Sequence, residues 1–92
     1  MKFMTEHSAY MAFNETESGM ALNEYHTKMQ AAMRETDEAI WNYEKEHHED
    51  APEYMYACHN LATSAEMAAK AMYVAAFGTW LKAAGHEIAD IF

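Results

Sequence analysis

Apolar residues recur every three or four positions along most of this chain, which is the spacing of one face of an α-helix. One such stripe begins after Ser18, a residue type that often caps a helix N-terminus. The stripe consists of Leu22, Tyr25, Met29, Met33 (or Ala32), Thr36, Ile40, Tyr43 and His47. The pattern predicts one long helix over residues 19–48.

A boundary follows in the sequence Asp50-Ala51-Pro52-Glu53, where proline suits a first helical turn and Asp50 and Glu53 have capping-box spacing. Beyond it, one apolar face comprises Tyr54, Cys58 (or Ala57), Leu61, Ala65, Ala68, Met72, Ala75 and Thr79, and a second comprises Tyr73, Phe77, Trp80, Leu81 and Ala84. We therefore expect a second long helix over 52–84, ended by Gly85. A short helix over about 3–13 and a short C-terminal extension over 86–92 complete the expected elements.

The composition supports an all-α fold, because the 92 residues include one proline and three glycines and lack hairpin-turn signals. Helices over 19–48 and 52–84 would be about 45 and 50 Å long, whereas a compact chain of this size has a radius of gyration of about 12 Å. We therefore expect a single domain over 1–92, built as an elongated antiparallel helical hairpin with a short N-terminal helix. Its thin core would be completed within a three-helix bundle, or within a four-helix bundle through dimerisation.

Charge is concentrated in one segment. The chain has 15 acidic residues against six Lys and Arg, for a net charge of −9, and residues 35–53 alone carry −7. The acidic residues of this segment are Glu35, Asp37, Glu38, Glu44, Glu46, Glu49, Asp50 and Glu53. So acidic a chain is poorly suited to bind nucleic acid or anionic membranes directly. In the expected hairpin, these carboxylates lie at one pole of a rod.

This acidic pole suggests a surface for a basic protein partner, since clustered carboxylates select partners by electrostatic complementarity. Trp41, Tyr54 and Tyr56 lie within or beside it and are candidate aromatic anchors. Other interpretations of these residues remain open. The carboxylates could form a solvated, solubilising helix face or bind cations, and Trp41 could pack against the N-terminal helix instead.

A metal site is a further alternative. Glu44 and His47 form a Glu-x-x-His pair, as used in di-metal helical bundles, and His48 and Glu66 could add ligands. A second Glu-x-x-His pair is missing, so we expect no metal and no other cofactor. We also expect no enzymatic activity, because nucleophile and phosphate-loop motifs are missing and Cys58 falls on an apolar stripe, where cysteine usually packs as a small buried side chain.

The cysteine count and the N-terminal sequence suggest where in the cell the protein is located. With Cys58 as the one cysteine, an intrachain disulfide is impossible, and the first 15 residues lack the apolar run of a signal peptide. These features predict a cytoplasmic protein that is not inserted in a membrane.

In its length, its local charge of −7 and its lack of catalytic motifs, the chain resembles the small acidic inhibitors encoded by bacteriophages and mobile elements, including anti-CRISPR proteins and other nucleic-acid mimics. The resemblance implies steric and electrostatic blockade of a basic site that otherwise holds nucleic acid. It carries over no site residues. The alternative function is a structural bundle that dimerises through its Ala and Met faces.

Overall fold

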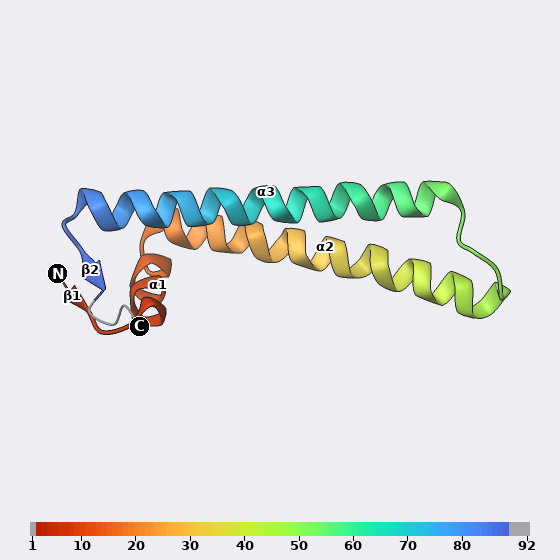
Figure 1. The fold of residues 1–92 in the computed structure, drawn as a ribbon, viewed down its shortest axis with the longest axis horizontal. Coiled ribbons are helices and arrows are strands. Elements are labelled where there is room, and N and C mark those ends of the chain that lie inside the picture. Colours follow the sequence, from red (N-terminus) through yellow and green to blue (C-terminus); the bar gives the residue numbers. More distant parts are fainter. Residues whose placement is uncertain (1, 89–92) are drawn as a thin grey trace.

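The computed structural model describes residues 2–88 and confirms the all-α hairpin. Helix α1 covers Glu6–Asn14, α2 covers Glu17–His47 and α3 covers Glu53–Ala83. Figure 1 shows α2 and α3 side by side as an antiparallel pair, with α1 lying across the end where α2 begins. The molecule measures 56 × 24 × 17 Å, and its radius of gyration is 18.0 Å.

The N-terminal caps of α2 and α3 differ from those predicted, and α1 begins at Glu6 and not near residue 3. Thr16, not Ser18, caps α2, because its hydroxyl accepts a hydrogen bond from the Gly19 amide at 3.0 Å. The expected capping box of Asp50 and Glu53 is wrong, since Pro52 occupies the N-cap of α3 and no side-chain bond caps that helix. Helix α2 ends at His47 and is capped by His48, which adopts the left-handed conformation (φ 54°, ψ 34°) often seen at helix C-termini.

The contact between α2 and α3, here called the seam, follows a heptad pattern. On α2 the inward positions alternate by three and four residues: Gly19, Leu22, His26, Met29, Met33, Thr36, Ile40 and Tyr43. On α3 they are Met55, His59, Ala62, Glu66, Ala69, Tyr73, Ala76 and Trp80. This spacing is that of two helices supercoiled around each other. The predicted α2 stripe is therefore largely confirmed, with His26 in place of Tyr25 and with His47 exposed beyond the end of the seam.

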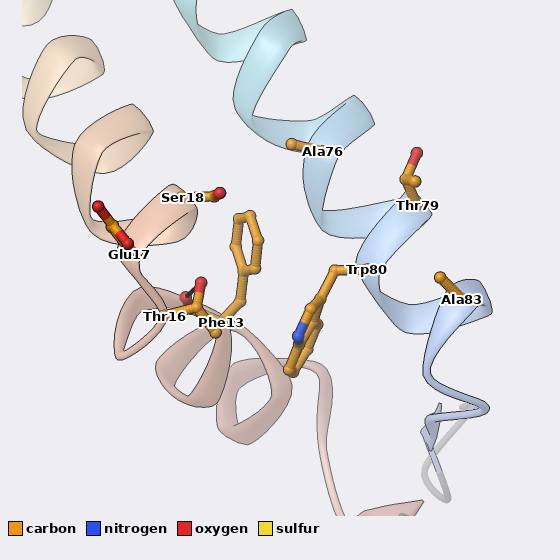
Figure 2. Close-up of a pocket in the computed structure, with 8 residues that line it drawn as sticks. All are labelled: Phe13, Thr16, Glu17, Ser18, Ala76, Thr79, Trp80 and Ala83. Carbon is orange, nitrogen blue, oxygen red and sulfur yellow. Dashed lines mark hydrogen bonds between the residues drawn. The ribbon is translucent and has the colours of Figure 1, made fainter.

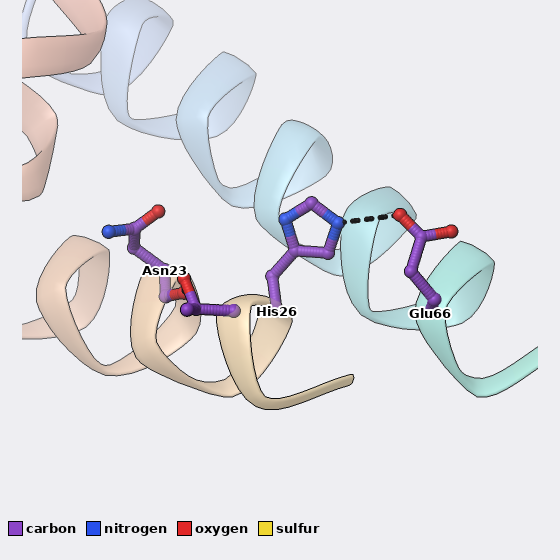
Figure 3. Close-up of polar contacts among 4 residues, drawn as sticks. Asn23, His26 and Glu66 are labelled. Atoms are coloured by element: carbon purple, nitrogen blue, oxygen red, sulfur yellow. Dashed lines mark hydrogen bonds and ion pairs between the residues drawn. The ribbon is translucent and has the colours of Figure 1, made fainter. Parts of the chain in front are cut away.

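Polar side chains interrupt the seam at two levels. The His26 imidazole lies 2.9 Å from the Glu66 carboxylate (Figure 3), and the Thr36 hydroxyl lies 2.9 Å from Nδ1 of His59. Each pair joins α2 to α3 and satisfies polar groups that are partly withdrawn from water. The hairpin is thus held by a narrow apolar seam with polar cross-links.

The first predicted α3 stripe faces solvent, contrary to expectation. We call this set the outer stripe: Tyr54, Cys58, Leu61, Ala65, Ala68, Met72, Ala75 and Thr79. All are exposed except the half-buried Ala65. The true inward face begins one residue later, at Met55. Since α3 is apolar on several sides, spacing alone could not identify the side that meets α2.

The principal core lies at the α1 end of the hairpin. Phe3, Ala9, Phe13 and Phe77 are buried there, and Tyr73 and Trp80 pack against them. The Tyr10 and Phe77 rings stack at 3.9 Å between centroids. The second predicted α3 face therefore does form core through Tyr73, Phe77, Trp80 and Leu81, whereas its last member, Ala84, is exposed beyond the end of α3.

A small parallel strand pair closes the same end. β1 (Lys2–Phe3) pairs with β2 (Glu87–Ile88), with Phe3 opposite Ile88. Within the expected extension 86–92, residues 87 and 88 therefore form a strand, whereas 89–92 lie outside the described residues. Over residues 2–88, no helix combines the length and apolar character needed to cross a bilayer.

Candidate protein-binding surface

The distal end of the hairpin carries the acidic pole, defined as residues 35–53. Seven of its eight acidic side chains are exposed: Glu35, Asp37, Glu38, Glu46, Glu49, Asp50 and Glu53. Within residues 2–88, none of these seven carboxylates forms an ion pair. Their negative charge is therefore directed at solvent and is not neutralised locally.

Glu44 differs from the other carboxylates because it holds the turn together. One of its oxygens accepts hydrogen bonds from the Ala51 amide, at 3.1 Å, and from the Tyr56 hydroxyl. These bonds, the one from Tyr56 above all, lower the pKa of Glu44, and the same bond raises the pKa of Tyr56. Glu44 thus stabilises the hairpin tip. Its bonded oxygen is less available to a partner than the seven exposed carboxylates of the pole.

Trp41 is the most prominent aromatic group of the pole, with 61 % of its surface exposed. It lies far from α1, so its expected alternative packing against the N-terminal helix is wrong. The Lys45 ammonium sits 4.8 Å from the centre of its ring, and Asp37 and Glu38 precede it by one helical turn. An exposed aromatic ring within a charged rim is the arrangement found at the centre of many protein interfaces.

The three aromatic candidates lie on two different sides of the hairpin. Tyr54 lines a hollow of about 220 Å³ together with Ala39 of α2. Trp41 follows Ala39 by two residues, about 200° around the helix, and so points to the opposite side. Tyr56 bonds to Glu44, which is three residues from Trp41 and therefore a neighbour on the helix surface. The structure thus associates Tyr56 with Trp41 and separates Tyr54 from both.

The four residues considered for a metal site are not brought together. Glu66 pairs with His26 in the seam, and His26 and Glu44 are 18 residues apart on α2, which is about 27 Å. His47 turns back on its own helix, where Nδ1 lies 2.9 Å from the Tyr43 carbonyl oxygen. Over the described part of the chain, no three His, Cys, Asp or Glu side chains gather as a metal site would require.

Cys58 was expected to be buried and is exposed. Many of the methionines are not core residues either, since Met4, Met11, Met20, Met67 and Met72 are exposed. Both findings have the same cause, namely that the hairpin has one narrow seam and cannot bury all of its apolar side chains. Sequence spacing placed Cys58 and Met72 on an apolar face but could not show that this face lacks an intrachain partner.

A second hollow, of about 410 Å³, lies where the α1–α2 corner meets α3. Figure 2 shows the Phe13 and Trp80 rings at its base, with Ser18 on one wall and Ala76 and Thr79 on the other. Its walls are mainly apolar, and the Thr16 hydroxyl is already engaged in capping α2. Spacing did not predict this hollow, because it is formed by three separate elements.

In comparisons with protein families, curated proteins and solved structures, nothing matches this chain.

Proposed function

We propose that this protein is a non-enzymatic binding module whose acidic pole docks on a basic protein surface. The observation that carries the proposal is the exposure of Trp41 among carboxylates that have no ion-pair partner within residues 2–88. Leaving a large aromatic ring in water forgoes about 1.5–3 kcal/mol of burial free energy, which a partner could recover.

The proposed target class is a protein that binds nucleic acid, and the proposed outcome is inhibition. Nucleic-acid-binding grooves are rich in Lys and Arg, so a dense set of carboxylates can compete with phosphates for them. Blockade would be steric and electrostatic. The free thiol of Cys58 suits a reducing compartment, and we propose the cytoplasm.

Charge reversal tests this function. The double variant Glu38→Lys/Glu49→Lys changes the pole, and Glu15→Lys/Glu24→Lys applies the same change in net charge to exposed positions outside it. Protein captured from the source cell by the wild type should be lost with the first variant and retained with the second. Capture should also weaken as salt is raised. Glu44 is left intact so that the turn is preserved.

Trp41→Ala provides the second arm of the test. The substitution leaves the charge unchanged and removes an exposed ring, so helicity measured by circular dichroism should remain. Affinity for the captured protein should fall at least about tenfold, as expected for an interface anchor. The proposal fails if both reversal pairs behave alike, or if the pole variant retains its partner.

A further inference from the structure

Helix α3 has an unusually apolar surface for a helix that packs on the rest of the chain mainly along one side. Of its 31 residues only Glu53, Glu66, Lys70 and Lys82 are charged, whereas ten residues of the equally long α2 are charged. A helix that is apolar on nearly all sides is normally buried on all of them. In the single chain, however, α3 is covered mainly on the side of the seam.

The outer stripe lies on one broad side of the hairpin that includes both helices. Leu61 and Met72 in its centre are 72 % and 53 % exposed. The two hollows open beside its two ends, where Ala39 and Ser18 of α2 form their opposite walls. Ser18 and Ala39 are three heptads apart, so the intervening heptad positions, Tyr25 and Ala32, lie along the same side. We call the outer stripe together with these four α2 residues the uncharged face.

The accessible surface area of the chain is larger than that of a compact monomer of the same mass. Its accessible area is 6721 Å², whereas a compact monomer of 10.5 kDa exposes about 5,400 Å². The excess is about 1,300 Å², and a standard stable interface takes about 800 Å² from each partner. The chain therefore exposes, beyond the surface of a compact monomer, more area than one partner contributes to a standard stable interface.

The outer stripe is complementary to itself when two copies run in opposite directions. Its members alternate by four and three residues from Tyr54 to Thr79. The order of these spacings is the same from either end of the stripe. With the two-fold axis between Ala65 and Ala68, every position meets a member of the other copy's stripe. The resulting layers pair Tyr54 with Thr79, Cys58 with Ala75, Leu61 with Met72, and Ala65 with Ala68. Large side chains oppose smaller or flexible ones, and alanines at the centre allow close helix approach.

Charge favours the same orientation. A parallel pair would place two acidic poles side by side, each carrying −7. An antiparallel pair places each pole beside the other copy's α1 end, and the residues outside the pole carry only −2 in total. Like charges repel, so the antiparallel arrangement is favoured.

We propose that the occupant of the uncharged face is a second copy of this chain, and that two hairpins form an antiparallel four-helix bundle. Such a two-fold interface uses the same patch on both subunits. It leaves Trp41 exposed on the opposite side of each hairpin. This proposal therefore does not depend on the function assigned to the acidic pole, and either can fail alone.

Cysteine cross-linking of the full-length chain tests the proposed register. In Ala75→Cys, the new thiol should lie against Cys58 of the second copy and yield a covalent dimer on mild oxidation. Cys58 and residue 75 of one chain are about 25 Å apart along α3, too far for an intrachain disulfide. The wild type should give little covalent dimer, because its two Cys58 thiols are equally far apart.

Two matched variants control the cross-linking. Val74→Cys places an exposed thiol one residue away, on a different side of α3, and should cross-link little. Cys58→Ser/Ala75→Cys retains the new thiol, removes its expected partner and should lose the cross-link. Efficient linkage in Val74→Cys or in the wild type would overturn the register.

Sedimentation equilibrium tests the assembly itself. The wild type should sediment with twice the mass of 10.5 kDa. Met72→Glu should raise the dimer dissociation constant at least about 100-fold, because it buries a carboxylate twice in a two-fold interface. Met72 is exposed in the single hairpin, so the helicity of the monomer should persist. A monomeric wild type at all concentrations, or dimers unaffected by Met72→Glu, would overturn the proposal.

Discussion

The imidazole Nε2 of His26 and the carboxylate Oε1 of Glu66 lie 2.9 Å apart across the seam, with 17 % and 14 % of their side-chain surfaces exposed. Both residues occupy heptad positions that would otherwise hold apolar side chains. A polar pair at such positions aligns one helix against the other, because a shift of register would leave both groups without a partner.

Replacing one member of this pair should cost more than replacing both. Glu66→Leu leaves the His26 nitrogen without its acceptor and should lower the free energy of unfolding by about 1–3 kcal/mol. The double variant His26→Leu/Glu66→Leu should recover that loss, since both polar groups are removed together. Urea denaturation of the two variants measures the difference. A double variant less stable than Glu66→Leu would contradict this explanation.

Replacement by alanine should lower the stability of the protein at one glycine and raise it at another. A Cβ at Gly19 would overlap the Phe13 carbonyl oxygen and lie 2.6 Å from its carbonyl carbon, both on the backbone. Gly19→Ala should therefore separate α1 from α2 and cost at least about 2 kcal/mol. At Gly78, inside α3, a Cβ meets open space. Gly78→Ala should stabilise the helix by about 1 kcal/mol, and thermal unfolding of both variants tests the contrast.

His48 adopts a positive φ of 54°, which costs a residue with a Cβ about 1–2 kcal/mol. His48→Gly should raise the free energy of unfolding by about 1 kcal/mol, whereas His48→Ala retains the strain and should not. Chemical denaturation of this pair separates the backbone effect from loss of the imidazole. Equal stability of the two variants would argue against strain at this position.

The hairpin tip should be sensitive to acid through Glu44. The hydrogen bond from Tyr56 lowers the pKa of Glu44 from its ordinary value of 4.5, so the charged carboxylate is favoured in the folded state. Its contribution is present above about pH 4.5 and is lost as the pH falls through the lower pKa of the folded state. Tyr56→Phe should raise the pKa of Glu44 and move the acid transition of the tip to higher pH.

The control for this substitution is Tyr54→Phe, because Tyr54 is 68 % exposed and points to the other side of the hairpin. Titration of the Glu44 carboxyl carbon by nuclear magnetic resonance measures the pKa directly. An unchanged Glu44 pKa in Tyr56→Phe would show that the Tyr56 hydroxyl does not favour the charged carboxylate.

Much of the fold could be predicted from local patterns. The three- and four-residue spacing from Leu22 to Tyr43 identified α2 because that helix has one apolar side and one charged side. The same reasoning was wrong about the outer stripe of α3, where Tyr54 and Leu61 are exposed. The pairing of Phe3 with Ile88 was missed entirely, because strands of two residues have no usable periodicity.

The candidate site shows the same division. Charge counting located the acidic pole, and seven of its carboxylates are indeed exposed. It could not distinguish Glu44, whose role depends on an amide and a hydroxyl supplied from beyond the turn. Nor could it place Trp41 and Tyr54 on opposite sides, since that follows from the rotation of two helices about their axes.

By itself, the sequence determined the helices, the hairpin and the position of the charge, because propensity, periodicity and charge act over a few neighbouring residues. Only the tertiary structure decided which side of α3 meets α2 and which carboxylate supports the turn. Those choices depend on contacts between residues such as His26 and Glu66, which are 40 positions apart in the chain. Local patterns do not distinguish one apolar face of α3 from another, and packing against α2 determines which face is buried.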